Sequence, residues 1–459
     1  MKHIHLIGIG GTGLSAIAKL LKESGYQVSG SDQVVGPLAA ALIEMGIQVY
    51  EGHHAENIAG ADVVVQSSAV AADNPEIVAA RAAGIPVFKR SEFLGRLLAG
   101  KTGIGVAGTH GKTTTTSMIA WMLTTLGRDP SYIVGGVIKG LDSNAHAGSG
   151  AEFVIEADEY DRMFHGLHPQ VAVITNMEHD HPDCYPTLQD YRQAFVQYAC
   201  SVKPGGLVLL CADDPAATSL AGEITAGINT HSYGLQSAAD YHAENVHLVD
   251  GYYHFDMLKN SPGAKMILAK DVHLIPPGQH NVQNAVAALA IADLLGLDLS
   301  AAATALATYP GSGRRFEVVG VVDNITLIDD YAHHPTEIAA TLSAARSRFT
   351  RSRIWAVWQP HTFSRTRLLA DAFAASFDKA DRVIVTEIYA SREKNQAYSS
   401  ARVAGLIPEK KGLYLRTLQE TTEYLSQHLQ PGDILVVLSA GDADQINRQL
   451  RQQLSERTH

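Results

Sequence analysis

The segment GVAGTHGKTTTT, residues 105–116, constrains the fold of this chain more than any other feature of its sequence. An apolar strand precedes its glycines and a helix is predicted to follow from Lys112, which is the setting of a phosphate-binding loop. The backbone N–H groups of such a turn and the helix N-terminus can hold a polyphosphate, and Lys112 adds a positive charge. The strict pattern GxxxxGKS/T is not met, because Val106 stands where its first glycine belongs. A nucleotide-binding variant of the loop is therefore predicted, and the alternative is a plain strand-to-helix turn with a solvated lysine.

The residues predicted to bind the nucleotide phosphates follow one another in this loop. They are Gly108, Thr109, His110, Gly111, Lys112, Thr113 and Thr114. The hydroxyl of Thr113 can also ligate Mg²⁺, as the Ser or Thr of a phosphate loop does.

A second glycine turn lies near the start of the chain. Residues 8–13 match GxGxxG between an apolar strand and a helix, and Asp32 ends the next strand. Ser67 and Ser68 close a further strand, at the sheet edge where ligands of open α/β sheets bind. This pattern predicts a diphosphate at a helix N-terminus but does not specify the nucleotide, so an NAD-dependent oxidoreductase is one alternative. A glycine turn that serves packing alone is another. Because a second nucleotide loop follows at residue 108, a UDP-sugar diphosphate is the better prediction.

Acidic and histidine residues follow two of the strands predicted for the middle of the chain. EADEYD, residues 156–161, comes directly after an apolar strand, and its hard carboxylate oxygens, beginning with Glu156, suit Mg²⁺. A solvated acidic turn is the alternative. TNMEHDHPD, residues 175–183, ends the next strand and includes His181. This second segment predicts a metal site, and zinc is a further candidate, although no Cys/His set completes a tetrahedron.

The strands and helices predicted along the chain give an α/β protein with three domains. Short apolar runs alternate with amphipathic stretches in residues 1–100, which implies a parallel, Rossmann-like sheet. Residues 101–309 hold the phosphate loop, further buried strands and a polar stretch near residues 222–271 that is predicted to be antiparallel. This part is predicted to be a nucleotide-binding α/β domain with a mainly parallel sheet. Residues 310–459 again alternate strands with helices and are predicted to form a third α/β domain.

Length and composition bound the class of protein. The 459 residues fit three domains at roughly 150 residues each. A formal net charge of −11 argues against broad binding to nucleic acid or to an anionic membrane. No apolar run approaches the roughly 18 residues that span a bilayer, and no signal peptide precedes the first strand. With only three widely spaced cysteines, reduced thiols fit best, so a cytoplasmic protein is predicted.

Taken together, the motifs resemble those of the Mur ligases. The chain contains, in the order found in that family, GTHGKTTT, EADE, TNxExDH, GxHNxxNA, RRFE, DDYAHHPTEI and QPHxxSRT. The branch that adds L-alanine is favoured by GIGGTGLSA with GSD and SSAV, and by GLDSNAHAG. The resemblance implies a Rossmann-like UDP-binding domain, a central P-loop ATPase domain with a mainly parallel sheet, and a C-terminal Rossmann-like domain that closes over the site. It also implies ATP and Mg²⁺, and the small-molecule substrates UDP-N-acetylmuramate and L-alanine, in peptidoglycan precursor synthesis.

The resemblance assigns roles in the first two domains. Lys112 is expected to bind the β- and γ-phosphates, Thr113 and Glu156 to hold one Mg²⁺, and His181 to hold a second. The residues expected at the UDP-sugar are Gly10, Gly11, Gly13, Asp32, Ser67 and Ser68.

The remaining roles fall later in the chain. Asn281 is expected to read the adenine edge with support from Asn284, Arg315 to reach the γ-phosphate, and Asp330 to bind the ATP ribose. The residues expected to line the muramyl and amino-acid side are Tyr331, His333, His361 and Arg365.

The reaction implied is amide formation through an acyl phosphate, with four residues predicted to be catalytic: Lys112, Glu156, His181 and Arg315. Two alternatives stay open. EADEYD also occurs in the relative that adds a preformed tripeptide, and a nucleotide-sugar sensor would bind without turnover. Both a monomer and a homodimer are compatible with the sequence.

Overall fold

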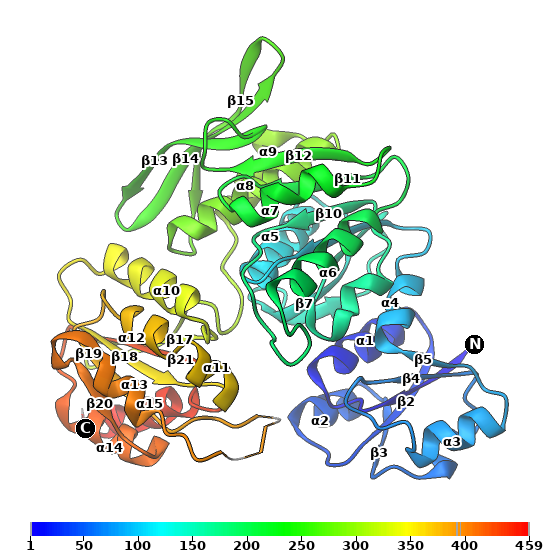
Figure 1. The fold of residues 1–459 in the computed structure, drawn as a ribbon, viewed down its shortest axis with the longest axis horizontal. Coiled ribbons are helices and arrows are strands. Elements are labelled where there is room, and N and C mark those ends of the chain that lie inside the picture. The colour runs from blue at the N-terminus through cyan, green and yellow to red at the C-terminus, as the bar shows by residue number, and fades with distance from the viewer. Residues whose placement is uncertain (1, 392, 395, 458–459) are drawn as a thin grey trace. The chain divides into compact units, whose positions relative to one another are not determined.

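The computed structural model describes residues 2–391, 393, 394 and 396–457 (Figure 1). The chain divides into two compact units. The first comprises Met1–Asn245, Asp256–Val272 and Gln283–Tyr309, and the second comprises Val246–Phe255, His273–Val282 and Pro310–His459. The predicted α/β fold with three domains is confirmed. The domain limits near residues 100 and 309 stay predictions.

The N-terminal domain is a five-stranded parallel sheet in the order β3-β2-β1-β4-β5. Its strands are β1 His3–Ile7, β2 Gln27–Asp32, β3 Gln48–Glu51, β4 Val63–Gln66 and β5 Val87–Lys89. Its helices are α1 Thr12–Glu23, α2 Pro37–Glu44, η1 Ala55–Ile58, α3 Pro75–Ala82 and α4 Arg90–Leu97. β1 is buried along its whole length, as expected for a central parallel strand covered on both faces.

The second sheet has ten strands in the order β15-β14-β13-β12-β11-β10-β6-β9-β7-β8. They are β6 Thr102–Ala107, β7 Ser131–Ile138, β8 Ser143–His146, β9 Glu152–Glu156, β10 Val171–Ile174, β11 Leu207–Cys211, β12 Asn229–Gly234, β13 Tyr241–Val249, β14 Tyr252–Ser261 and β15 Ala264–Leu274. The accompanying helices are α5 Lys112–Thr125, η2 Tyr160–Gly166, α6 Leu188–Cys200, α7 Pro215–Thr218, η3 Ser219–Glu223, α8 Gln279–Leu294 and α9 Leu299–Ala307.

One pairing in this sheet corrects the prediction. β12 runs parallel to both β11 and β13, so the start of the polar stretch near residues 222–271 is not antiparallel. The chain crosses from β11 to β12 through α7 and η3, which returns it in the same direction. Polar composition alone does not reveal that crossover.

The C-terminal domain is a six-stranded sheet in the order β16-β17-β21-β18-β19-β20, parallel except for β16. Its strands are β16 Glu317–Val322, β17 Ile325–Asp330, β18 Ile354–Gln359, β19 Arg382–Val385, β20 Gly412–Tyr414 and β21 Ile434–Ser439. Its helices are α10 Pro335–Arg348, α11 Phe363–Leu368, α12 Ala370–Ala375, α13 Ala401–Leu406, η4 Pro408–Lys410, α14 Leu418–His428 and α15 Gln445–Arg457.

One apolar core joins the N-terminal and central domains within the first unit. It includes Leu14 and Leu94 from α1 and α4, together with Phe153 and Phe164 from the central domain. Polar contacts reinforce it, because Lys19 in α1 donates a hydrogen bond to Ser143 in β8. The turn before α1 and the loop before α5 are therefore held on a common core.

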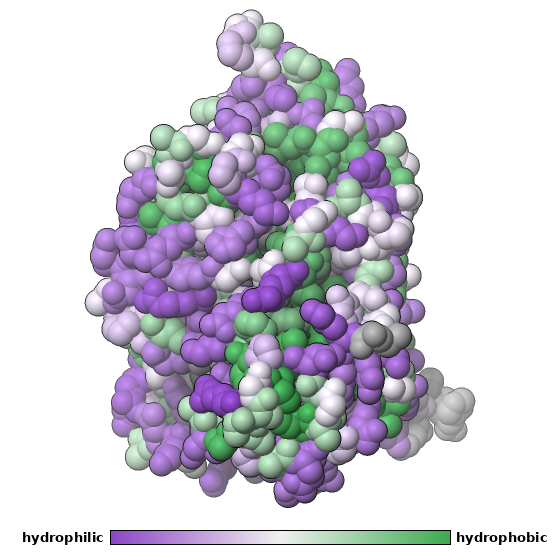
Figure 2. Space-filling view, turned by 90° about the vertical axis from the view of Figure 1, so that its right-hand side faces the viewer, coloured by the Kyte–Doolittle hydropathy of each residue, from purple (hydrophilic) through white to green (hydrophobic). Residues whose placement is uncertain are grey.

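Hydrophilic and hydrophobic residues are interspersed on the face of the molecule drawn in Figure 2. Large exposed apolar side chains such as Val34, Val78 and Leu188 come from separate elements, as is usual at a protein surface. Within the described part of the chain, no helix has both the length and the apolar character needed to cross a bilayer.

A buried carboxylate ties the edge of the N-terminal sheet together. Glu76 in α3 is fully buried and accepts hydrogen bonds from Ser31 Oγ (2.6 Å) and Asn57 Nδ2 (2.6 Å). Its Oε2 also lies 3.5 Å from His5 Nε2. Burial raises the pKa of Glu76, but the hydrogen bonds from His5, Ser31 and Asn57 outweigh it and hold the pKa below its usual value. Ser31 precedes Asp32, so this network anchors the strand end that faces the glycine turn.

We predict that Glu76→Gln lowers the free energy of unfolding at pH 7 by about 2–4 kcal/mol, because a neutral amide places a donor against donors. The pKa of Glu76 is lower in the folded state than in the unfolded state. The ionised Glu76 therefore contributes its full stabilisation at pH values above the unfolded-state pKa, and this stabilisation is lost as the pH falls through the folded-state pKa. Urea unfolding between pH 3 and pH 7 should give a shallower pH dependence for the variant. The exposed Glu44→Gln is the control, and equal curves for both variants contradict the prediction.

Candidate functional site

The predicted phosphate loop, residues 108–111, connects β6 to α5 and depends on two glycines. Gly108 has φ 140° and Gly111 has φ 79°, both in the region that favours glycine. A Cβ at Gly108 would overlap Thr175 Oγ1, and a Cβ at Gly111 would lie 3.0 Å from Asn284 Oδ1. Gly111 is the N-cap of α5 and has no side chain to accept from the first-turn N–H groups, an arrangement suited to an anion.

Lys112 is the first residue of α5, and its ammonium group is surrounded by acceptors. Nζ donates to the carbonyl oxygens of Gly108 (2.6 Å) and Thr109 (3.1 Å), and it lies 2.9 Å from Glu159 Oε2. The side chain of Glu159 is only 1% exposed. Burial lowers the pKa of Lys112, but nearby carboxylates, Glu159 foremost, outweigh it and raise that pKa. Burial in turn raises the pKa of Glu159, and the charge of Lys112 opposes that shift. Lys112 therefore stays protonated, with Glu159 as its counterion.

Two predicted metal ligands meet beside this ion pair. Thr113 Oγ1 donates to Glu156 Oε1 over 3.1 Å, and the N–H of Gly135 donates to the other carboxylate oxygen over 2.7 Å. Thr113 lies in α5 and Glu156 ends β9, so separate elements bring the two donors together. A hydroxyl and a carboxylate in contact are hard oxygen donors, and this donor set fits Mg²⁺.

The structure also brings His181 to the Lys112 pair. His181 Nε2 lies 3.8 Å from Glu159 Oε1 and 3.7 Å from Asp180 Oδ2. Its ring meets that of Tyr160 edge to face, with centroids 5.0 Å apart. The imidazole nitrogen thus faces two carboxylates, a position from which it can take part in holding a cation.

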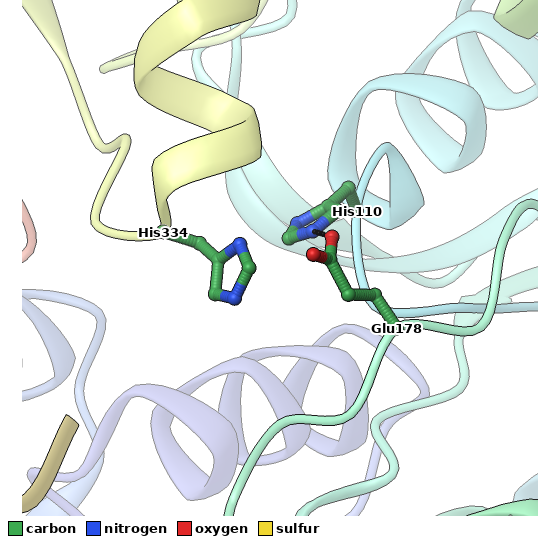
Figure 3. Close-up of side chains that lie close together, drawn as sticks. All are labelled: His110, Glu178 and His334. Atoms are coloured by element: carbon green, nitrogen blue, oxygen red, sulfur yellow. Dashed lines mark hydrogen bonds and ion pairs between the residues drawn. The ribbon is translucent and has the colours of Figure 1, made fainter. Parts of the chain in front are cut away.

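The segment after β10 clamps the phosphate loop. Thr109 Oγ1 donates to the carbonyl of Glu178 (2.7 Å), and the N–H of His110 donates to Asn176 Oδ1 (2.8 Å). Thr175 Oγ1 donates to the carbonyl of His110 (2.6 Å). Figure 3 shows the ring of His110 and the carboxylate of Glu178 pointing toward each other, with Nε2 and Oε2 2.9 Å apart. These hydrogen bonds connect the phosphate loop to the segment after β10 and so fix the shape of the loop.

The N-terminal glycine turn is organised by the end of β2. The N–H groups of Gly8 and Ile9 donate to the carbonyl of Ser31 (2.8 and 3.0 Å), and the N–H of Gly10 donates to Asp32 Oδ2 (2.8 Å). Gly8 has φ 85°. Asp32 therefore positions the turn that leads into α1.

The other residues predicted at the UDP-sugar lie around this turn. The N–H of Gly11 donates to the carbonyl of Gly8 (3.1 Å), and Gly13 lies in the first turn of α1. Ser67 follows β4 and packs against the turn, because a Cβ at Gly8 would lie 3.1 Å from Ser67 Cβ. Ser68 is exposed.

A cavity of about 110 Å³ lies between the first turn of α1 and the end of β9. It is lined by Thr12, Gly13, Ala16, Ile17, Arg90, Leu94, Ile133, Val134, Gly135, Ile155, Glu156, Asp158 and Met163. Residues predicted for the UDP-sugar and for the metal thus border one space.

Asn281 and Asn284 lie one turn apart in α8. Asn281 Nδ2 donates to the carbonyl of Pro277 (2.6 Å), which fixes it in the turn that begins the helix. Asn284 lies beside Gly111 of the phosphate loop. The predicted supporting residue is therefore placed at the loop.

In the second unit the predicted substrate residues form a ring cluster. The ring centroids of Tyr331 and His333 are 5.5 Å apart, and those of His333 and His361 are 5.8 Å apart. Tyr389, which sequence reasoning missed, stacks on His361 at 5.9 Å. Arg365 is buried in α11.

Arg315 and Asp330 lie beside this cluster in the second unit. The Arg315 guanidinium lies 5.3 Å from the centre of the Tyr331 ring. Asp330 accepts from the N–H groups of Phe316 (2.7 Å) and Ala332 (2.8 Å). Burial raises the pKa of Asp330 to about 6, and Arg315 opposes the shift.

Sequence reasoning missed residues whose role depends on contacts between separate segments. Glu159 belongs to the same EADE motif as Glu156, but only the structure identifies it as the partner of Lys112. Asn176 and Glu178 lie in the segment predicted to bind metal, and the structure shows that their side chains also contact the phosphate loop.

Three family models match the chain: "Mur ligase family, catalytic domain" over residues 3–102, "Mur ligase middle domain" over residues 106–292, and "Mur ligase, glutamate ligase domain" over residues 314–441. The UDP-N-acetylmuramate–L-alanine ligase of Roseiflexus sp. (strain RS-1) is 42% identical over 457 residues, 96% of each chain. That of Salinibacter ruber is 42% identical over 447 residues, 96% of this chain and 93% of the relative.

Two solved structures resemble this chain over nearly its full length. The crystal structure of the UDP-N-acetylmuramate-alanine ligase from Thermotoga maritima has a TM-score of 0.82, 30% identity and 100% coverage of both chains. The murein peptide ligase from Psychrobacter arcticus has a TM-score of 0.71, 26% identity and 99% coverage of both chains.

We predict that Gly108→Ala weakens ATP binding by at least about 10-fold, because a strained φ and the clash with Thr175 cost about 1–3 kcal/mol. Isothermal titration with ATP and Mg²⁺ measures the effect. Gly127→Ala is the control, since Gly127 also has a positive φ (72°) but its Cβ would meet nothing within 4 Å. Equal ATP affinities for the two variants contradict the prediction.

Proposed function

Because the chain belongs to the Mur ligase family, we propose that it is an ATP-dependent ligase that joins L-alanine to the carboxylate of UDP-N-acetylmuramate in peptidoglycan precursor synthesis. The observation that carries the phosphoryl-transfer part is Lys112, paired with the buried Glu159 at the end of a glycine loop, with the Thr113–Glu156 pair beside it. The choice of L-alanine is supported by relatives that are about 40% identical over almost the whole chain.

The first chemical step activates the muramyl carboxylate. A carboxylate is a poor acyl donor because its leaving group would be oxide. One carboxylate oxygen attacks the γ-phosphorus of ATP, the bond from that phosphorus to the β,γ-bridging oxygen breaks, and ADP leaves. Lys112 neutralises the phosphate oxygens as charge shifts toward ADP, and the N–H groups of the phosphate loop orient them. For this, Lys112 exchanges its contact with Glu159 for a contact with phosphate.

Thr113 and Glu156 hold one Mg²⁺ in this proposal, and His181 holds a second. When bound, the ions offset the negative charge of the phosphate groups and of the carboxylate that approaches them. Glu159 lies between Lys112 and His181, so it balances whichever of the two carries excess positive charge.

The second step forms the amide. The neutral amine of L-alanine attacks the acyl carbon, the bond from that carbon to the phosphoryl oxygen breaks, and inorganic phosphate leaves. The nitrogen loses a proton to solvent. Exclusion of water from the acyl phosphate limits its hydrolysis.

The later assignments in the chain belong to the same proposal. Asn281 reads the adenine, Asp330 binds the ribose and Arg315 meets the γ-phosphate. The muramyl and amino-acid groups meet Tyr331, His333, His361 and Arg365. The contiguous ring cluster of Tyr331, His333 and His361 supports a shared role for these three residues.

A second candidate is a ligase that attaches a preformed tripeptide. It is favoured by EADEYD and by the similarity to the murein peptide ligase of Psychrobacter arcticus. The higher TM-score and identity of the alanine ligase from Thermotoga maritima favour L-alanine.

ATP and the UDP-sugar are cytoplasmic metabolites in this proposal, so the reaction takes place in the cytoplasm.

We predict phosphate release that requires ATP, Mg²⁺, UDP-N-acetylmuramate and L-alanine together. Lys112→Met should slow it by at least about 1,000-fold, because the phosphoryl group loses its principal cation. The exposed Lys270→Met is the matched control. Release that depends on the tripeptide L-Ala-γ-D-Glu-meso-diaminopimelate in place of L-alanine selects the second candidate. Binding of the UDP-sugar with no release for any acceptor contradicts a ligase and indicates a sensor.

We also predict that ¹⁸O moves from the substrate carboxylate into inorganic phosphate. The acyl phosphate requires this transfer, because the oxygen that attacks phosphorus leaves with it. Mass spectrometry of phosphate from a reaction with [¹⁸O]carboxylate UDP-N-acetylmuramate measures it. Amide formation without labelled phosphate contradicts the acyl-phosphate route, while leaving the ligase activity in place.

A further inference from the structure

The cavity between α1 and β9 has mostly apolar walls and one cation. Leu94, Ile133 and Ile155 are among its apolar residues. Among the described residues that line it, Arg90 is the only one with a positive charge, whereas Glu156 and Asp158 are acidic. None of the roles assigned above involves Arg90.

Arg90 is placed directly over the first turn of α1. A Cβ at Gly13 would overlap Arg90 Nη1, so the third glycine of the GxGxxG turn leaves the space that this guanidinium fills. Nε donates to the Met163 sulfur, and Nη2 lies 3.7 Å from Asp158 Oδ2. Arg90 is also the first residue of α4, which packs into the core shared by the two domains. Its backbone position is therefore fixed by packing.

The guanidinium is enclosed more than its partner is. The side chain of Arg90 is 19% exposed, while that of Asp158 is 39% exposed. Burial lowers the pKa of Arg90, and Asp158 and Asp161 oppose the shift. The 3.7 Å between Arg90 Nη2 and Asp158 Oδ2 is long for a charge-assisted hydrogen bond. Asp158 therefore offsets the charge of Arg90 without accepting a short hydrogen bond from its guanidinium group.

We propose that Arg90 is a substrate-binding residue that takes an anionic oxygen group of the nucleotide-sugar. The proposal rests on the proposed function. Two groups of UDP-N-acetylmuramate have the required chemistry, the diphosphate and the lactyl carboxylate. Either group enters a cavity whose other charged residues are acidic, so the binding of an anion there depends on the one cation. Asp158 is the counterion of Arg90 until the substrate replaces it.

The test compares Arg90→Met with Arg96→Met, the same substitution at an exposed position of the same helix. Calorimetry measures the affinity for UDP-N-acetylmuramate and for UDP-N-acetylglucosamine, which lacks the lactyl carboxylate. Arg90→Met should weaken UDP-N-acetylmuramate binding by about 10- to 100-fold, the usual effect of losing a hydrogen bond to a charged group. The KM for ATP should stay within about twofold, a split that a general loss of structure would not give.

The two ligands identify the group that Arg90 binds. An equal loss for both ligands places Arg90 on the diphosphate. A loss confined to UDP-N-acetylmuramate places it on the lactyl carboxylate. Arg90→Lys keeps the charge and should fall between the wild type and Arg90→Met, which guards against a variant that fails to fold.

Gly13→Ala gives an independent measurement, because the added methyl must displace the guanidinium. Because only the wild type has a guanidinium to displace, Gly13→Ala should weaken UDP-N-acetylmuramate binding by a larger factor in the wild type than in the Arg90→Met background. If the wild type binds and turns over the UDP-sugar and Arg90→Met binds it equally well, Arg90 is not a ligand and the proposed function stands. If the wild type itself does not bind it, both proposals are wrong.

Discussion

The ion pair between Lys112 and Glu159 is the contact on which the site at residues 108–113 depends. An ammonium group enclosed by two loop carbonyls and only partly open to water is costly unless a carboxylate balances it. Glu159 supplies that balance, and its own burial is tolerated only because Lys112 is there. The pair ties the EADE segment to the phosphate loop, so the residue types of the two motifs are required together.

Packing connects the phosphate loop to the N-terminal glycine turn. The core shared by α1, α4 and the central domain keeps the turn at residues 8–13 and the loop at residues 108–111 in one unit. Lys19 in α1 donates to Ser143 in β8, and Glu23 accepts from the N–H of Ala147. The segment GLDSNAHAG thus has a structural reason to accompany the glycine turn. A ligand that contacts both the turn at residues 8–13 and the loop at residues 108–111 would therefore bind to a surface that is already formed.

The buried parallel strands could be predicted from sequence because they are continuous apolar runs, as β6, β10 and β11 illustrate. The phosphate loop and the glycine turn could be predicted because glycine is required there by backbone geometry. The edge strands β8 and β20 escaped prediction, since they are short and only half buried. Glu159 escaped for a different reason: nothing in the letters EADEYD distinguishes a fully buried acid from its exposed neighbours. The ring contact of Tyr389 with His361 joins positions far apart in the chain and has no local signal.

The net charge of the chain opposes the approach of anions. A chain with a formal charge of −11 repels the phosphate groups of ATP and of a UDP-sugar at long range, although salt screens that repulsion beyond about 10 Å. An anion that binds to this chain must therefore be held by short-range groups, such as the N–H groups of two helix starts and the cations Lys112 and Arg90. Both cations already hold acidic partners, Glu159 and Asp158, with which an anion has to compete.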